Sequence, residues 1–136
     1  MSLINLKTPD TIAPPAGPYS HTAAVTIGDV ELIFVAGEWS TDIDGNLVGE
    51  NDMFAQTQQT LKNIQSVLEA NGASFEDVFK MSVYVTDMDR RQEVSDARKA
   101  FLPSPPPISS IFEISKLALP GLMIEIEAVA AKKVTA

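Results

Sequence analysis

The clearest alternation of apolar and polar positions lies near the C-terminal end of the chain, and it predicts a strand over residues 122–131. One face of this strand is entirely apolar, with Leu122, Ile124, Ile126, Ala128 and Ala130. The other face carries Glu125 and Glu127 between apolar neighbours. Either this second face is solvated, or its carboxyl groups lie against an apolar wall, where the pKa rises and proton transfer near neutral pH becomes easier.

Four further strands are predicted from runs of β-branched and apolar residues, over 21–27, 30–36, 78–85 and 108–114. The short gap at Gly28 favours a hairpin between the first two. The apolar run from Leu32 onward indicates burial on both faces. Gly37 ends that run, and a glycine there indicates either a bulge or the close approach of a backbone or ligand.

Apolar residues at helical spacing predict a long helix over 51–70, with Phe54, Leu61, Ile64 and Leu68 on its inner face. Its other face, rich in Gln, Thr and Asn, is expected to be solvated. A shorter helix is predicted from residue 86 to about residue 101, where a proline-rich stretch ends it. Residues 1–16 contain three prolines and are expected to form an irregular N-terminal segment.

The order of these elements predicts one α+β domain over residues 1–136, with a mixed sheet and two helices on one face. Two helices cover only one side of a sheet. An apolar sheet face of that extent is rarely left to solvent, so we expect self-association.

Composition narrows the chemistry. The 136 residues are 45% hydrophobic and include no cysteine, which excludes disulfides, thiolate metal sites and a cysteine nucleophile. His21 is the single histidine, so a histidine-rich metal site is impossible within one chain. We therefore expect no metal site built on thiolates or on several histidines.

The formal net charge of −8 argues against binding to nucleic acid or to anionic membrane surfaces, because both are polyanionic. The sequence also lacks an apolar run of 18 residues and the pattern of a signal peptide. A cytoplasmic location and no membrane association are expected.

Five segments in this order resemble the RidA family, also called YjgF or endoribonuclease L-PSP. The segments are Ala16-Gly-Pro-Tyr-Ser20, Ile33-Phe-Val-Ala-Gly37, the helix and its exit from Ala55 to Ser74, Val83-Tyr-Val-Thr-Asp-Met88 and Ile124-Glu-Ile-Glu-Ala-Val-Ala130. The resemblance implies a chorismate-mutase-like fold and a homotrimer with a central barrel and small-molecule pockets between subunits. It also implies hydrolysis of reactive enamines and imines, of the 2-iminobutanoate type, to 2-oxo acids and ammonia without a cofactor.

The resemblance also nominates site residues. Tyr19 matches the tyrosine that lines the family's pocket, and Gly37 matches the glycine whose backbone faces the ligand. Glu125 matches the glutamate that orients the attacking water, so resemblance and strand pattern select the same carboxyl. Trp39 lies on the expected cleft side and is either a wall of the cleft or an anchor of the core or interface.

Three polar positions depart from the family pattern. Ser109 stands where the substrate-anchoring arginine is expected, or Ile108 does if the register slides by one residue. Ser95 replaces an asparagine of the second helix, and His21 replaces a glutamine. His21 is either a proton carrier or simply a packed or solvated side chain. Arg98, one helical turn after Ser95, is a candidate replacement cation or a solvated surface residue.

Three functions follow as hypotheses. The first is a divergent imine or enamine hydrolase that uses Glu125. The second is a binding or regulatory trimer that has lost hydrolysis, because a serine does not replace a bidentate guanidinium. The third is a ribonuclease, which the negative charge and the absence of a paired catalytic histidine argue against.

Overall fold

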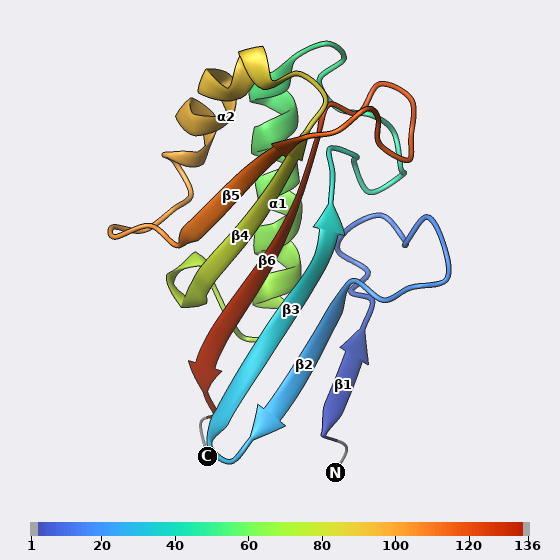
Figure 1. Cartoon of the computed structure of the whole chain (residues 1–136). Helices are drawn as coiled ribbons and strands as arrows, with labels where there is room; N and C mark the ends of the chain where they lie inside the picture. Colours follow the sequence, from blue (N-terminus) through green and yellow to red (C-terminus); the bar gives the residue numbers. More distant parts are fainter. Residues whose placement is uncertain (1–2, 135–136) are drawn as a thin grey trace.

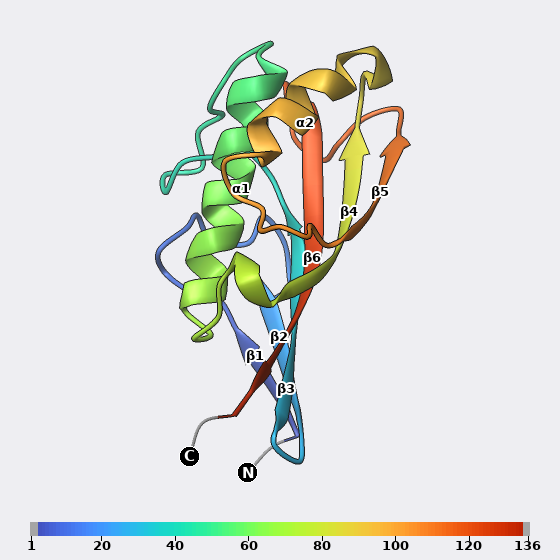
Figure 2. The ribbon, with the colours of Figure 1, turned by 90° about the vertical axis from the view of Figure 1, so that its left-hand side faces the viewer.

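The computed structural model describes residues 3–134 and consists of one six-stranded sheet with two helices packed on one face (Figures 1 and 2). The strands are β1 (Ile4–Lys7), β2 (Thr22–Ile27), β3 (Val30–Glu38), β4 (Val78–Val85), β5 (Ile108–Glu113) and β6 (Ile124–Lys133). The helices are α1 (Met53–Glu69) and α2 (Arg91–Arg98), with short 3₁₀ turns at Phe75–Asp77 and Met88–Arg90.

The strand order is β1-β2-β3-β6-β4-β5, so the C-terminal strand lies in the middle of the sheet. All neighbouring pairs are antiparallel except β4 and β5, which are parallel. The prediction of an α+β fold with a mixed sheet and both helices on one side is therefore confirmed. The central position of β6 places Glu125 between β3 and β4.

The apolar row predicted on β6 packs beneath the helices. Leu122, Ile124, Ile126, Ala128 and Ala130 are all buried, and they join the core formed by α1 with β3 and β4. The alternation is strict because each residue of this row faces the helices while its neighbours face away. Glu125 and Glu127 consequently lie on the face of the sheet that no helix covers.

Helix α1 begins after Asp52, whose carboxylate accepts a hydrogen bond from the Ala55 N–H. Leu61, Ile64 and Leu68 are fully buried, as predicted. The prediction for Phe54 is wrong: its side chain is 39% exposed, and Met53 is buried instead. The buried stripe runs through positions 53, 57, 60–61, 64 and 67–68, so Phe54 falls at its edge.

The expectation of a solvated Gln/Thr/Asn face on α1 is also wrong. Gln56, Thr57, Thr60 and Asn63 are buried. Two of them bond the main chain of distant loops instead of water, with Gln56 reaching the segment before β6 and Asn63 the segment after β3. Helix α1 therefore contributes both to the core and to the placement of two loops.

Two boundaries differ from expectation. The second helix is shorter than predicted and is preceded by a 3₁₀ turn, and its Val94 and Ala97 side chains are buried. The N-terminal segment is not entirely irregular, since Ile4–Lys7 forms β1 and pairs with β2. Four residues are too few for an alternation to stand out beside the following prolines, and the neighbouring edge of β2 supplies the hydrogen bonds.

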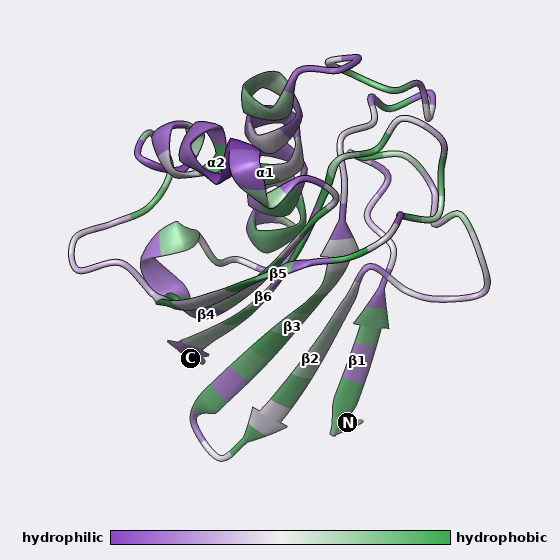
Figure 3. Ribbon diagram, turned by 45° about the horizontal axis from the view of Figure 1, so that its top comes forward, coloured by the Kyte–Doolittle hydropathy of each residue, from purple (hydrophilic) through white to green (hydrophobic). Residues whose placement is uncertain are grey.

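The uncovered sheet face carries an apolar row that crosses four strands. Leu6, Ala23, Phe34 and Val129 lie directly opposite one another from β1 to β6, and Lys80 on β4 ends the row. The hydropathy colouring shows how much of β1, β2 and β3 is apolar compared with α2 (Figure 3). Phe34 is 43% exposed and Leu6 63% exposed, which leaves a large apolar surface without cover in a single chain.

Candidate active site

Gly37 and Glu125 meet where β3 is interrupted by a bulge. The register between β3 and β6 shifts between Val35 and Glu38, so two residues of β3 oppose one of β6. A Cβ atom on Gly37 would lie 2.3 Å from Glu125 Oε2. The bulge expected at Gly37 is confirmed, and the missing side chain makes room for the Glu125 carboxylate, where the sequence had suggested a backbone or a ligand.

Glu125 is partly buried and accepts no hydrogen bond from any of the residues 3–134. Burial raises the pKa of its carboxyl above the ordinary value, and the negative charges of Glu127 and Glu38 add to the increase. A carboxyl with a raised pKa and free oxygens is suited to bind a water molecule and to exchange protons with it.

Beside this carboxyl, His21 and Glu38 form a buried pair. His21 Nδ1 lies 2.9 Å from Glu38 Oε2, and His21 Nε2 lies 2.9 Å from the Ala13 carbonyl oxygen. Burial alone lowers the pKa of His21, but the hydrogen bond and negative charge of Glu38, with the Ala13 carbonyl, raise it overall. Burial raises the pKa of Glu38, although His21 opposes that increase.

Tyr19 and Trp39 line one cavity of about 280 Å³ together with this pair. The Tyr19 ring packs edge-on against His21, with ring centroids 6.3 Å apart. The Tyr19 hydroxyl accepts a hydrogen bond from the Ala16 N–H at 3.3 Å, and Trp39 is partly buried. Predicted site residues thus form two neighbouring groups, Gly37 with Glu125 and Tyr19 with Trp39.

Buried amides of α1 hold the loops around these groups. The Asn63 side chain donates to the carbonyls of Trp39 and Thr41, at 2.9 and 3.0 Å. The Gln56 amide donates to Gly121 at 2.9 Å and accepts from the Met123 N–H at 2.8 Å, directly before β6. Both ends of the site, Trp39 after β3 and the start of β6, are therefore fixed to the same helix.

Ser95 lies elsewhere, in a separate cavity of about 420 Å³ between α2 and the segment that leads to β5. Arg98 lines the same cavity. Its guanidinium is partly buried and has neither a hydrogen bond nor an ion pair with the described residues, and burial lowers its pKa. Lys99 is the second cation in the lining of this cavity. It is exposed and forms an ion pair with Asp96.

Ser109 lies on the edge strand β5 and is exposed. It pairs with Met81, which is buried beneath the helices, so the Ser109 side chain is directed to the helix side of the sheet. Glu125 pairs with Tyr84 on the opposite, uncovered side. In one protomer, Ser109 and Glu125 therefore cannot contact the same small molecule.

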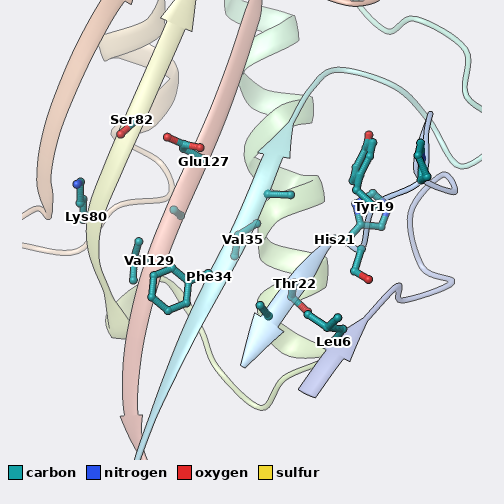
Figure 4. A pocket seen from close by; sticks show the side chains of 15 residues that line it. Leu6, Tyr19, His21, Thr22, Phe34, Val35, Lys80, Ser82, Glu127 and Val129 are labelled. Atoms are coloured by element: carbon teal, nitrogen blue, oxygen red, sulfur yellow. The ribbon is translucent and has the colours of Figure 1, made fainter. Parts of the chain in front are cut away.

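A cavity of about 670 Å³ lies over the uncovered sheet face. Tyr19 and His21 lie at one end, and Glu127, Ser82 and Lys80 lie at the other (Figure 4). Glu127 accepts a hydrogen bond from the Tyr84 hydroxyl at 2.9 Å, whereas the Glu125 carboxylate has no hydrogen-bonding partner among the described residues.

Neither a membrane span nor a metal cluster is found in the described part of the chain. No helix within residues 3–134 is long and apolar enough to cross a bilayer. Across the same residues, no three His, Asp or Glu side chains gather in a way that would hold a metal ion.

Comparison with known proteins places this geometry in a family. The sequence model of the family described as endoribonuclease L-PSP matches residues 10–132. The chain belongs to the endoribonuclease L-PSP family.

A RutC family protein from Pyrococcus horikoshii is 34% identical over 88% of this chain and 90% of its own length. A protein from the mite Dermatophagoides farinae, named 2-iminobutanoate/2-iminopropanoate deaminase, is 29% identical over 91% of this chain and 92% of its own length. The crystal structure of a putative endoribonuclease from Thermotoga maritima superposes with a TM-score of 0.83 at 32% identity, over 95% of this chain and 98% of that one.

Within this endoribonuclease L-PSP fold, the sequence did not reveal Glu38, Gln56 or Asn63 as parts of the site. Glu38 follows Gly37 directly, and a charged residue at the end of an apolar strand was the available signal. For the two amides the signal was their spacing along α1, since Gln56 follows the buried Met53 by three residues and Asn63 follows the buried Thr60 by three.

Proposed function

We propose that this protein hydrolyses small reactive imines and enamines to the corresponding oxo compounds and ammonia. The Glu125 carboxylate would accept a hydrogen bond from a water molecule and take its proton as the oxygen attacks the imine carbon. It would pass that proton to the nitrogen to give a carbinolamine, and would then carry the remaining hydroxyl proton to the nitrogen as the C=O bond forms, the C–N bond breaks and ammonia leaves. No cofactor is needed, because water supplies the oxygen and both hydrogens that the reaction consumes.

One observation carries this proposal: Glu125 is a partly buried carboxyl with a raised pKa and no hydrogen-bonding partner among the described residues. Its carboxylate lies against the Gly37 backbone, in the space that a side chain at position 37 would otherwise fill. The mite relative named as an iminobutanoate deaminase supports the same substrate class.

We further propose that the active form is a cytoplasmic homotrimer with its sites between subunits. The uncovered apolar row on the sheet needs a partner, and a second copy presents the same row. Ser95 and Ser109 lie on the other side of the sheet from Glu125, so a site that combines them requires residues of two protomers. Light scattering in solution tests this arrangement, and a monomer would contradict it.

The experiment that tests hydrolysis generates an imine in place. An amino acid oxidase forms the imine, semicarbazide traps it, and the protein competes with trapping if it is active. The wild type is expected to suppress trapping, and Glu125→Gln to lose about 10²–10⁴-fold of that activity. Glu127→Gln is the matched control, since it removes a carboxylate two residues away on the same face. Trapping that is unaffected by the wild type for every amino acid tested would refute the proposal.

Ser109 favours a second candidate function, a trimer that binds small molecules without hydrolysing them. A serine hydroxyl offers one neutral hydrogen bond where a guanidinium offers two charge-assisted ones. Calorimetry with short carboxylic acids, alongside the trapping assay, separates the two functions. Binding without competition would support the second.

The ribonuclease activity that the family description suggests has less support. His21 is the single histidine, and both of its ring nitrogens are engaged, by Glu38 and Ala13. It is therefore not free to act as acid or base on RNA.

A further inference from the structure

We propose that His21 and Glu38 share a single proton and act as positioning residues, fixing the β3 bulge at Gly37 and through it the direction of the Glu125 carboxylate. The catalytic part of this inference rests on the proposed function. The shared proton does not, and it is tested separately below.

The proton count follows from the hydrogen-bond partners. A carbonyl oxygen only accepts, so the 2.9 Å contact with Ala13 places a proton on His21 Nε2. In neutral imidazole, Nδ1 is then an acceptor, and so is an ionised carboxylate. The 2.9 Å contact between Nδ1 and Glu38 Oε2 therefore requires one proton between them. The pair is either imidazolium with carboxylate or imidazole with carboxylic acid.

No other group in the cavity can neutralise Glu38. His21 is 4% exposed and Glu38 is 5% exposed. The residues that line the 280 Å³ cavity include Asp44 as a further charge but no Lys or Arg. Tyr19 and Asn63 face the pair as neutral groups, and Glu125 on β6 adds negative charge. Lys80 and Glu127 line only the larger cavity that His21 also reaches. Loss of the shared proton would leave a buried carboxylate unpaired, which is strongly unfavourable.

The pair connects three segments of the chain at the site. Ala13 belongs to the N-terminal segment, His21 directly precedes β2, and Glu38 ends β3. Glu38 is bonded through the main chain to Gly37, on which the Glu125 carboxylate rests. Because both nitrogens of His21 are engaged, the imidazole does not reach a substrate. Of the two interpretations of His21 from the sequence, the geometry favours a packed side chain, but one that carries a proton.

The first experiment uses the single histidine as its own label. Long-range ¹H–¹⁵N NMR of the wild type gives one set of imidazole signals, which need no assignment by mutation. The expected spectrum shows a proton on Nε2 and a titration above the ordinary histidine pKa, because Glu38 favours the protonated ring. A proton on Nδ1 with Nε2 bare, or titration at the ordinary value, would overturn the shared proton.

The second experiment measures stability against pH. Both pKa values are raised in the folded state, so folding retains a proton that the unfolded chain releases. The stabilisation is fully present below the ordinary histidine pKa and is lost as pH rises through the folded value. In that window the unfolding equilibrium constant should rise about tenfold per pH unit.

Glu38→Gln should remove this slope, since its amide donates to Nδ1 without a titratable proton. Glu93→Gln, which breaks the exposed pair with Arg90, is the control and should keep it. Equal slopes in the wild type and Glu38→Gln would contradict the inference.

The third experiment separates positioning from folding. Glu38→Ala should lower kcat about tenfold or more with little change in KM, and Glu38→Gln should recover much of that loss because it restores the hydrogen bond. If Glu38→Ala fails to fold, His21→Gln provides the same comparison. A crystal structure of either variant with Gly37 and Glu125 unmoved would overturn the positioning role, whether or not the protein hydrolyses imines.

Discussion

The residues proposed for the site fall into two regions that differ in how firmly they are held. The Glu125 region comprises Tyr19, Gly37, Trp39 and Glu125, and it is supported by the His21–Glu38 pair and by buried amides of α1. The Ser109 region comprises Ser95, Arg98 and Ser109. It lies on the other side of the sheet, where both serines are exposed and Arg98 has no partner among the described residues.

The difference indicates which task each region performs. Groups that act on water must be placed accurately, and buried hydrogen bonds supply that accuracy within one chain. Ser109, proposed to contact the rest of a substrate, lies on the edge strand β5, where in the proposed trimer a neighbouring subunit would complete the surroundings. A change in the Ser109 region is thus expected to alter what binds, and a change in the Glu125 region to alter whether chemistry occurs.

The largest effect is expected from removing the amide that holds the start of β6. Gln56→Ala breaks three hydrogen bonds, to the carbonyls of Gly49 and Gly121 and from the Met123 N–H. The free energy of unfolding should fall by about 3 kcal/mol, because buried main-chain groups lose their partners. Denaturant titration measures this. Gln58→Ala on the same helix has no such bonds to lose and should change stability little; equal losses would contradict the role of Gln56.

A smaller effect is expected at the contact between β3 and β6. Gly37→Ala places a methyl group where the Glu125 carboxylate lies, and the flexible glutamate should move while the fold persists. Imine hydrolysis should fall about 10–100-fold with little change in melting temperature. Gly17→Ala is the control, since its added Cβ would meet only the Tyr19 ring at an ordinary 3.6 Å. Full activity of Gly37→Ala would show that the carboxylate position is unimportant.

The Ser109 region offers a gain instead of a loss. Ser109→Arg should raise kcat/KM for carboxylate-bearing imines about tenfold, because a guanidinium bonds a carboxylate in bidentate fashion. Ser110→Arg is the matched control: it lies on the same strand, and its side chain is directed to the opposite face. Comparing substrates with and without a carboxylate measures the gain. Equal responses from both variants would refute the placement of Ser109.

The smallest effect concerns pH. If deprotonated Glu125 is the active form, activity should rise with pH through its pKa, and this limb should lie above the ordinary glutamate range because burial raises that pKa. Glu127→Gln removes one of the further causes of the increase, so the limb should move to lower pH. A pH–rate profile of kcat/KM checks both statements, and an unmoved limb would exclude Glu127 as a contributor.

The sequence was sufficient for the elements whose pattern is long and regular. The alternation on β6 and the 3–4 spacing of Leu61, Ile64 and Leu68 predict both burial and fold class. It was insufficient where a polar residue is buried to bond a distant segment, as with Gln56 and Asn63, because composition does not distinguish such an amide from a solvated one. The four residues of β1 were missed for a related reason, since their pairing depends on β2.

The sequence predicts the candidate site to about the same extent as it predicts the fold. Glu125 and Gly37 follow from strand pattern and family resemblance, and the structure brings them into contact. The direction of the Ser109 side chain depends on the parallel register of β4 with β5, which no local pattern determines. The role of Glu38 depends on the bulge that turns it toward His21.

The hydrogen bonds of the Gln56 amide also affect how this protein tolerates insertions. The bonds from Gln56 to Gly121 and Met123 span 65 and 67 positions of sequence, yet they meet on one amide. An extra residue between these two would carry one of them out of reach, so this surface turn should resist changes of length that turns ordinarily accept.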